Sequence, residues 1–538
     1  MGSLEAEMDM HFLEEAFVEK SELASLKSLD DQKFILLGRT GSGKTAILQK
    51  IAKSDSGVPI KRISPEDISL NYLADSPILG FFREQNIKLD FAYKQIWKHI
   101  LVCNLLESHL GHTKTNIEKV KSFFGLGVTN IEKYVAQLDD GKLSLETERI
   151  VKVLEEDLSA NIITEYKLGI PNFISGLDGN LVEVTKKITK ERGLSQEYIK
   201  NTASRIIQKS IFKETDNLMK KAETTIFNST QKKYYIVIDD LDKDWVNEEI
   251  VYDLIKCLMY AIREFKNFKG VKIIIALREN LYRIVVNKAI ETRGEQSEKF
   301  DSCTLTLGWT KDELEDLINK RLSFIFKERY TNNVPKIKDI LKENEWQYML
   351  DRTLMRPRDL IDFFNKFITE FAKDSNSEIS NSSLIKSAEK IYSQNRLKAL
   401  NDEWNENYGN LELIYGFIAK QKTGFTMPTI ATHFDTFVSE KHNEMVLNAN
   451  FARKFKDELD EYANTMNNTK QLLTKFLVIL YDIGLIGFKD DSSKILYAYE
   501  NAGTILTENN MNVKHKFYVH KMFRLALGTI TSRDDRKA

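Results

Sequence analysis

The sequence predicts an α/β fold, in which a parallel sheet carries helices on both faces and long helical regions make the chain predominantly helical. Two observations lead to this prediction. Nearly continuous apolar runs, which are typical of parallel strands buried on both faces, alternate with helical stretches along the chain. The 538 residues also include only seven prolines, and a low proline content suits a helical chain.

The elements of the core are expected in a definite order. An amphipathic helix at 9–28 precedes strands at 34–37 and 58–63. After a long helical stretch, further strands are expected at 234–238, 271–276 and 303–307, followed by a helix at 311–327. The chain is therefore divided into an N-terminal helix (1–30), a first core segment (31–105), a mostly helical insertion (106–230), a second core segment (231–310), a helical lid (311–395) and a C-terminal domain (396–538).

The C-terminal domain is expected to be winged-helix-like. Its most apolar stretch, 472–483, is typical of a buried helix, and the strand-like residues 484–488 follow it. A polar turn at 490–493 leads into a second apolar segment at 494–499. The order helix, strand, turn, strand is the pattern of a wing, so we expect the two segments to pair as a hairpin.

The most informative motif is the octapeptide Gly-Arg-Thr-Gly-Ser-Gly-Lys-Thr at 38–45. It lies between the first strand and a helical stretch, where a phosphate-binding loop (Walker A motif) works. Glycines let backbone N–H groups surround phosphate oxygens, Lys44 would reach the β- and γ-phosphates, and Thr45 would hold Mg²⁺. The expected nucleotide contacts are Gly38, Arg39, Thr40, Gly41, Ser42, Gly43, Lys44, Thr45 and Ala46. The alternative is a glycine-rich turn that matches the pattern by chance.

Carboxylates follow the third expected strand. Asp239 at its tip is predicted to hold Mg²⁺ through the water shell of the ion. Asp240 is predicted to orient and deprotonate the attacking water, and Asp242 is a substitute for that role. In the alternative, Asp240 and Asp242 are only polar residues at the start of the loop that follows the strand.

Arginines complete the predicted site. Arg278, after the fourth strand, would sense the γ-phosphate, unless it only caps the strand or pairs with Glu279. Arg293 would act in trans as a finger in a neighbouring subunit. Arg356 or Arg358, at a helix start marked by Pro357, would reach over the nucleotide from the lid; the alternative is simple helix capping.

In this order the motifs resemble the AAA+/STAND branch of P-loop ATPases, and most closely the KAP-type NTPases. Residues 238–243 (Ile-Asp-Asp-Leu-Asp-Lys) are similar to the I-D-D-L-D-R box of that family, and 356–358 with 363–365 look like its lid helix. A long insertion between the Walker motifs is also common in that family, and here Lys44 and Asp239 lie 195 positions apart.

The resemblance implies ATP and Mg²⁺ as cofactors and a sheet in which the two Walker strands flank an inserted strand. It also implies a role in anti-phage defence. Because the family's relatives often have Glu where this chain has Asp240, we expect slow hydrolysis. No N-K-x-D guanine motif occurs, which favours ATP over GTP.

Composition limits the partners. The formal net charge of −1 creates no global attraction to nucleic acid or anionic lipid. The three cysteines, Cys103, Cys257 and Cys303, have no metal-binding spacing and are expected to be reduced, buried thiols. The apolar stretch near 472–488 is too short and too charged to span a bilayer. We therefore expect a cytoplasmic protein that acts as a homo-oligomer, with an effector protein, or both, and not at a membrane.

Three functions compete. The first is an ATP-hydrolysing switch or oligomeric ATPase subunit, and the second is a nucleotide-dependent DNA-binding regulator that uses the winged helix. The third is a nucleotide-bound scaffold without turnover. Residues 398–538 balance 18 Lys and Arg against 18 Asp and Glu, which opposes DNA binding. A local basic cluster favours it, formed by Lys514, His515, Lys516, His520, Lys521 and Arg524.

Overall fold

The protein divides into two compact units in a computed structural model, one of residues 19–307 and one that joins 1–18 to 308–538. Each unit has its own hydrophobic core. The structure describes residues 1–4, 8–53, 58–66, 88–110, 212–242, 248–293, 298–329, 334–374, 379–465, 469–489, 494–500 and 506–531, and five positions from 73 to 83. Most of the predicted insertion, 111–211, lies outside the described residues.

Unit 19–307 is built on a five-stranded sheet whose pairings are all parallel, which confirms the sheet that the sequence predicts. The strands follow the order β2-β3-β4-β1-β5, so β4 lies between β1 and β3. Their bounds are β1 (Ile35–Leu37), β2 (Ile60–Ile63), β3 (Tyr234–Ile238), β4 (Val271–Leu277) and β5 (Thr304–Thr306). All residues of β1, β3 and β4 are buried, as expected of strands covered on both faces.

The register brings four strand ends to one edge of this sheet. Leu37 at the end of β1 lies opposite Leu277 at the end of β4. Ile63 at the end of β2 likewise lies opposite Ile238 at the end of β3. The loops that follow these strands therefore leave the sheet at its carboxyl edge, where open α/β sheets bind their ligands.

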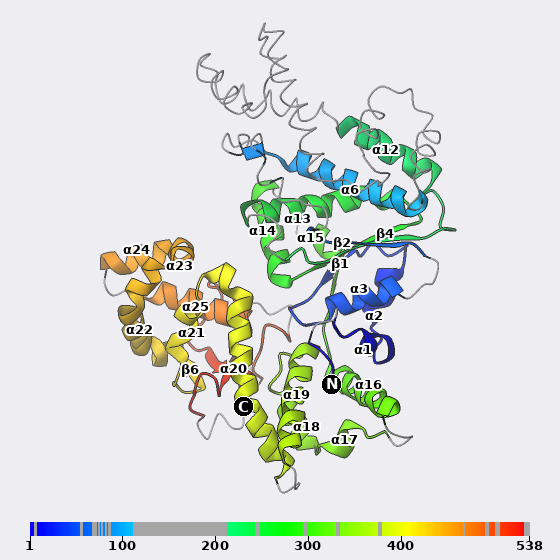
Figure 1. Ribbon diagram of the computed structural model, residues 1–538. Helices are drawn as coiled ribbons and strands as arrows, with labels where there is room; N and C mark the ends of the chain where they lie inside the picture. The colour runs from blue at the N-terminus through cyan, green and yellow to red at the C-terminus, as the bar shows by residue number, and fades with distance from the viewer. Residues whose placement is uncertain are drawn as a thin grey trace, which may run out of the picture. The chain divides into compact units, whose positions relative to one another are not determined.

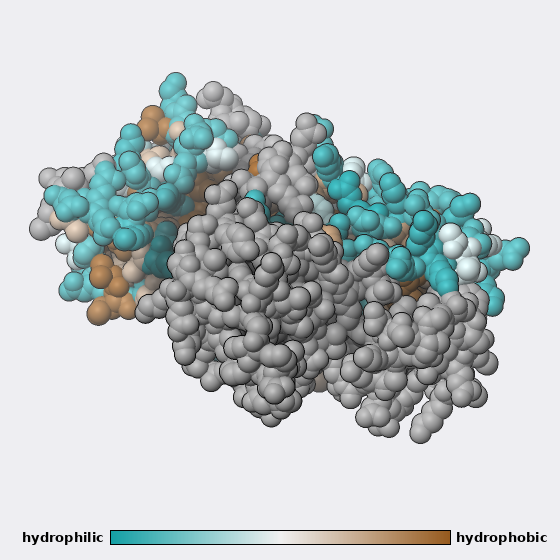
Figure 2. Space-filling view, turned by 90° about the horizontal axis from the view of Figure 1, so that it is seen from above, coloured by the Kyte–Doolittle hydropathy of each residue, from teal (hydrophilic) through white to brown (hydrophobic). Residues whose placement is uncertain are grey.

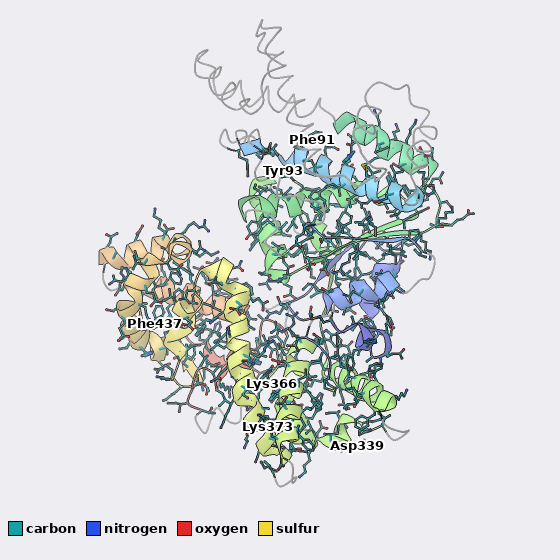
Figure 3. All side chains as sticks on the ribbon, viewed as in Figure 1. Phe91, Tyr93, Asp339, Lys366, Lys373 and Phe437 are labelled. Carbon is teal, nitrogen blue, oxygen red and sulfur yellow. The ribbon has the colours of Figure 1, made fainter. Side chains whose placement is uncertain are left out.

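Helices cover both faces of the sheet (Figure 1). One face carries α2 (Ser21–Lys27) and α3 (Lys44–Lys53), and the other carries α6 (Asp90–Leu110), α13 (Glu248–Arg263) and α14 (Glu279–Arg293). Trp97 of α6 is fully buried and donates to the carbonyl oxygen of Leu254 in α13 at 2.9 Å. Tyr93, also on α6, lies in the same layer (Figure 3). The unit is completed by α12 (Phe212–Thr225), which packs on α6, and by η3 (Glu264–Asn267) and α15 (Glu298–Asp301).

The single N-terminal helix predicted at 9–28 is wrong. The chain forms two short helices instead, α1 (Met10–Glu15) and α2. Lys20 between them has an extended backbone, with φ −116° and ψ 141°, which interrupts the helical path. Leu23 and Leu26 of α2 still bury one face, so the apolar spacing indicates the second helix but not the break.

The other unit is mainly helical. The predicted helix at 311–327 is confirmed as α16 (Lys311–Arg329), and the predicted helix start at Pro357 is confirmed as the first residue of α19 (Pro357–Lys373). Its long partner is α20 (Asn381–Tyr408), and the rings of Phe363 and Tyr392 stack between the two with centroids 4.4 Å apart. The remaining helices are α17 (Ile337–Ile340), α18 (Glu343–Leu350), α21 (Glu412–Tyr415), η4 (Gly416–Ile418), α22 (Met427–Leu447), α23 (Ala449–Lys454), α24 (Lys456–Thr465), α25 (Lys470–Asp482) and η5 (Lys521–Phe523).

A three-stranded antiparallel sheet lies near the C-terminus, in the order β6-β8-β7. It contains β6 (Gly424–Thr426), β7 (Ile486–Lys489) and β8 (Lys516–Val519). As predicted, a helix (α25) leads into a strand (β7), and the segment 494–499 returns to pair with β7, but only as an isolated antiparallel bridge; the continuous pairing of β7 is with β8. Only Leu496 of that segment forms a bridge, with Phe488. The predicted turn at 490–493 lies outside the described residues.

Both backbone bonds and side chains hold the segment 494–499 against β7. The Phe488 N–H donates to the carbonyl oxygen of Leu496 at 3.1 Å, and the Leu496 N–H donates to that of Phe488 at 2.8 Å. A Cβ on Gly487 would come 2.6 Å from the Tyr497 ring. Tyr497 and Tyr499 also stack on each other, with centroids 5.4 Å apart, and both rings contact His520. The predicted hairpin pairing is therefore reduced to a single bridge, and the packed aromatic rings hold the rest of the segment.

The cysteines and the described helices test two predictions drawn from composition. The three cysteines are all free and buried, as the sequence predicts. Within the described residues, no helix combines the length and the apolarity that a membrane crossing needs. On the face drawn in Figure 2, hydrophilic residues cover most of the described surface and hydrophobic ones gather in small patches.

Candidate functional site

The glycine-rich segment 38–45 forms a tight turn between β1 and α3. Gly41 and Gly43 have φ of 77° and 97°, in the region that favours glycine. The Ser42 N–H donates to the carbonyl oxygen of Arg39 at 3.1 Å, and the Ile47 N–H donates to that of Gly43 at 3.0 Å as α3 begins. The segment thus has the strand-to-helix geometry that the sequence predicts, with the helix N-terminus directly after the turn.

Gly38 and Lys44 close this turn. A Cβ on Gly38 would lie 2.4 Å from the Ser42 hydroxyl oxygen, so a side chain there would require the Ser42 side chain to move. Lys44 Nζ donates to the carbonyl oxygens of Gly38 and Arg39 at 2.9 and 3.2 Å. The ammonium group therefore lies against the turn, where its charge adds to that of the helix N-terminus and favours an anion.

Asp239, directly after β3, is the buried carboxylate of this edge. It is 4% exposed, and its Oδ1 accepts the Asp240 N–H at 3.0 Å. The Thr45 side chain is hydrogen-bonded to the same carboxyl group. Two segments that lie 195 positions apart therefore meet at this carboxyl group.

Burial raises the pKa of the Asp239 carboxyl above its ordinary value of 3.8, and the charge of Asp240 adds to this. The hydrogen bonds from Asp240 and Thr45 and the charge of Arg62 oppose the shift. Arg62 Nη2 lies 3.7 Å from Asp239 Oδ2. Because the fold disfavours the charged carboxylate, a cation bound beside it would be attracted strongly.

Asp240 has an unusual backbone. Its φ of 61° places a non-glycine residue in the left-handed region, immediately after the buried carboxylate. Aspartate and asparagine tolerate this region better than other side chains do. Such backbones persist only where the surrounding structure imposes them, and they are concentrated at functional sites.

Ion pairs connect the strand ends along this edge. Arg278, after β4, contacts Asp242, after β3, through its Nε atom. The next residue, Glu279, lies 3.6 Å from Arg39 of the turn. Arg278 therefore does not pair with its neighbour Glu279 as the alternative reading proposes, but with a carboxylate from the adjacent strand end.

Sequence reasoning missed Arg62, which comes one residue before the end of β2. The signal was present, because a strand is predicted at 58–63 and the ends of parallel strands meet at one edge. The sequence pattern does not indicate which strand lies beside 58–63 in the sheet. The pairing of β2 with β3 brings Arg62 to Asp239.

Three predicted arginines are not part of the described edge. The backbone of Arg293 ends α14, but its side chain lies outside the described residues. Arg356 and Arg358 belong to the other unit. There Arg358 Nε donates to the carbonyl oxygen of Leu4 at 3.3 Å.

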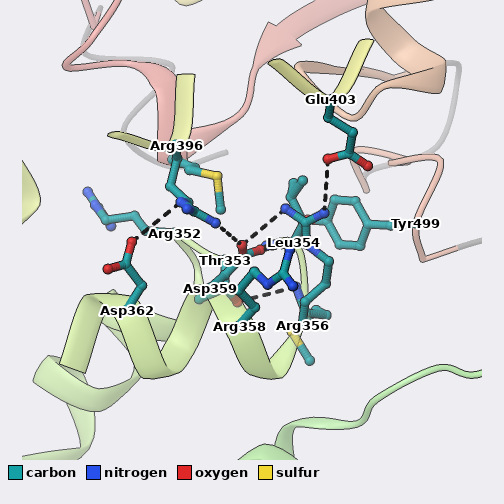
Figure 4. Close-up of polar contacts among 12 residues, drawn as sticks. Arg352, Thr353, Leu354, Arg356, Arg358, Asp359, Asp362, Arg396, Glu403 and Tyr499 are labelled. Carbon is teal, nitrogen blue, oxygen red and sulfur yellow. Dashed lines mark hydrogen bonds and ion pairs between the residues drawn. The ribbon is translucent and has the colours of Figure 1, made fainter. Parts of the chain in front are cut away.

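Arg356 belongs to a buried ion-pair cluster between α19 and α20 (Figure 4). It donates to Asp359 from two nitrogens, at 2.9 and 3.0 Å, and its Nη1 lies 3.9 Å from Glu403. Burial alone would raise the pKa of Asp359, but the charges of Arg356 and Arg396 outweigh it and hold that pKa below 3.8. Arg356 makes no side-chain cap bond, so these contacts indicate a structural role within its own unit.

The donor set at the carboxyl edge suits a hard cation. Thr45 offers a hydroxyl oxygen and Asp239 a carboxylate, and Mg²⁺ binds through one or two such groups together with waters and phosphate oxygens. No group of three or more His, Cys, Asp and Glu side chains in the described part of the chain is arranged to hold a metal. The two oxygen donors at the edge suit a magnesium ion that arrives with a phosphate.

Substituting Gly43 tests the turn itself. In Gly43→Ala the backbone keeps a φ of 97°, which a side chain tolerates poorly, at a cost of about 1–3 kcal/mol. We expect a lower melting temperature and loss of affinity for inorganic triphosphate, measured by calorimetry. The control Gly308→Ala, where a Cβ meets nothing within 4 Å, should leave both unchanged. Unaltered triphosphate affinity in Gly43→Ala would argue against phosphate binding by this turn.

Comparison with known proteins gives two similarities. Residues 312–401, which run from α16 into α20, match the family model described as the FunZ-associated C-terminal helical domain. The whole chain is similar to the "Putative transposon gamma-delta 80.3 kDa protein" of Escherichia coli K12, with 21% identity over 545 residues. That alignment covers 98% of this chain and 66% of the relative, so the chain spans just under two thirds of the relative's length.

Proposed function

We propose that the carboxyl edge of the parallel sheet binds ATP with Mg²⁺ and that the protein hydrolyses ATP slowly. The observation that carries this proposal is that the glycine-rich turn after β1 and the buried Asp239 after β3 lie at one edge of the parallel sheet, where the Thr45 side chain lowers the pKa of the Asp239 carboxyl. This arrangement joins the glycine-rich turn to the acidic strand end, and these are the two groups that a magnesium–nucleotide site requires from the protein. The motif pattern alone supplies both residues but not their proximity.

Each residue of the edge has a role in this proposal. Lys44 binds the β- and γ-phosphates and gives up its bonds to the loop carbonyls, while Thr45 and Asp239 hold the magnesium. Asp240 orients the attacking water and accepts its proton. Arg278 faces the γ-phosphate from the end of β4, the strand between β1 and β3. In the assembled protein, Arg293 supplies a finger to the site of a neighbour.

Asp240 offers the sharpest test, because asparagine keeps its left-handed backbone while removing the base. We expect Asp240→Asn to melt at the wild-type temperature and to bind ATP normally. Its phosphate release should fall about 100-fold or more, as for loss of a positioned base. Equal background rates for wild type, Lys44→Ala and Asp240→Asn would instead favour a nucleotide-bound scaffold without turnover.

We place this ATPase in a switch or an oligomer that acts with partner proteins. The E. coli relative is named after a transposon. We propose that this chain acts on or against mobile DNA, for example in defence against phages. Sizing the protein with and without a slowly hydrolysed ATP analogue tests the assembly. A strict monomer in both conditions would remove the finger role of Arg293.

DNA binding by the C-terminal region is the second candidate, and several contacts oppose it. His520 is 2% exposed, and burial lowers its pKa to about 3, so it is neutral. Lys521 pairs with Asp351 at 3.0 Å, and Arg524 Nε donates to the carbonyl oxygen of Val519 at 2.9 Å. These are three of the six residues of the predicted basic cluster.

The helix before β7, which would be the recognition helix of a winged helix, also opposes DNA binding. Most of α25 is buried, and its Lys475 pairs with Glu458 of α24. A helix packed in this way presents few side chains to a major groove. An electrophoretic shift of duplex DNA at low salt would restore this candidate.

A further inference from the structure

Asp242 makes an ion pair that the proposed roles above do not use. Its carboxylate contacts Nε of Arg278, and both side chains are mostly buried, at 21% and 28% exposed. Leu241, directly before it, is fully buried and fixes the loop that carries it. The contact spans the ends of two adjacent strands, β3 and β4.

A contact at Nε leaves the two terminal nitrogens of the Arg278 guanidinium group for a second partner. An arginine offers its donors along two edges, and an acceptor at Nε occupies only one of them. The edge formed by the two terminal nitrogens remains for a second oxyanion. Fixing the side chain through Nε also removes rotamer freedom before such an anion arrives, so less entropy is lost when it binds.

The same contact bears on the role of Asp242. The Asp242 carboxylate is occupied by the Arg278 guanidinium group. It therefore does not suit the substitute base that the sequence predicts. Asp240, two residues earlier, keeps that role.

We propose that Asp242 is a positioning residue that holds Arg278 by its Nε edge and aims its terminal nitrogens at the third phosphate of a nucleoside triphosphate. Through this pair the protein discriminates triphosphate from diphosphate. The inference rests on the proposed function, because it concerns the same nucleotide site. It assigns the discrimination to the pair, so that removal of either partner has the same effect.

The test compares nucleotide affinities and not activity. Calorimetry gives the dissociation constants of ADP and of a slowly hydrolysed ATP analogue, both with Mg²⁺, for wild type, Asp242→Asn, Arg278→Gln and the double variant. We expect the wild type to prefer the triphosphate about tenfold or more. Each single substitution should remove most of this preference while changing ADP affinity less than about twofold, and the double variant should lose nothing further.

Controls separate positioning from folding. Asp242→Glu keeps the carboxylate and should restore part of the preference. Glu264→Gln breaks an ion pair with Lys94 away from this edge, at 3.2 Å, and should change nothing. If Asp242→Asn is unstable, Asp242→Glu and Arg278→Gln still test whether the preference follows the pair.

Three results would overturn the inference. The first is a normal triphosphate preference in Asp242→Asn with reduced phosphate release, which would make Asp242 a base. The second is additive losses in the double variant. The third is a lower melting temperature with the preference intact, which would make the pair merely structural. A wild type that binds neither nucleotide would instead refute the proposed function, and the inference with it.

Discussion

Replacing Lys44 with alanine is expected to abolish the effect of nucleotide on this protein. Wild type with saturating Mg–ATP should melt at a higher temperature, because a ligand at 100 times its dissociation constant adds about 2.7 kcal/mol to the free energy of unfolding. Lys44→Ala removes the ammonium group that lies over the turn. Its melting temperature should no longer respond to Mg–ATP, and phosphate release should fall about 100-fold or more.

A second lysine on the same helix provides the control. Lys53 ends α3 on an exposed position, far along the helix from the turn. Lys53→Ala should keep both the nucleotide-dependent melting shift and the rate of phosphate release. An undiminished shift in Lys44→Ala would mean that nucleotide binds elsewhere, and the assignment of the turn would then be wrong.

Replacing Asp239 with asparagine should abolish both the response of the protein to Mg²⁺ and the hydrolysis of ATP. The amide retains the shape of the carboxyl group but binds Mg²⁺ poorly, so phosphate release should fall about 100-fold or more. Stability should not suffer. The fold raises the pKa of this carboxyl mainly by burial, so the ionised group costs free energy that the neutral amide does not.

The measurement is a pair of melting curves for each protein, with ATP alone and with ATP and Mg²⁺. We expect Mg²⁺ to raise the melting temperature of wild type and to have no effect on Asp239→Asn. Without nucleotide, the variant should melt at the same temperature as wild type or a few degrees higher. Asp301→Asn, an exposed aspartate that accepts a bond from Tyr282, serves as control. A full response to Mg²⁺ in Asp239→Asn would exclude this residue as a metal ligand.

The strands of the parallel sheet could be predicted from the local pattern of apolar residues. The runs at 234–238 and 271–276 are buried on both faces in the sheet, and residues of that kind have no other way to exclude water. The spacing of glycines in 38–45 likewise indicates the turn, since Gly41 and Gly43 adopt backbones that other residues avoid. Placement of Thr45 and Asp239 at one edge then follows from parallel strand order.

Other features depend on contacts between distant segments, which no local pattern contains. The pairing of Arg278 with Asp242 requires β3 and β4 to be neighbours, and that of Arg62 with Asp239 requires β2 beside β3. The segment 494–499 is as apolar as a strand but pairs with β7 only at Leu496, whereas β8 pairs with all four residues of β7. Composition determines which segments are buried, whereas the choice of neighbour decides which of them pair.

The arginines of the predicted lid illustrate the same limit. Arg356 lies at the start of α19, where the motif places it, but its guanidinium group is engaged by Asp359 and Glu403. Sequence spacing suggests only the first of these partners, because Glu403 comes from α20. The burial of Arg356 within its own unit is therefore explained by the packing of α19 on α20.

The central claim is that the turn at 38–45 and Asp239 form one magnesium–nucleotide site. The most direct test is a calorimetric titration of the wild-type protein with a slowly hydrolysed ATP analogue, in the presence and absence of Mg²⁺. We predict one binding event per chain, with an affinity that Mg²⁺ raises about tenfold or more. Absence of binding, or binding that Mg²⁺ does not affect, would contradict the claim.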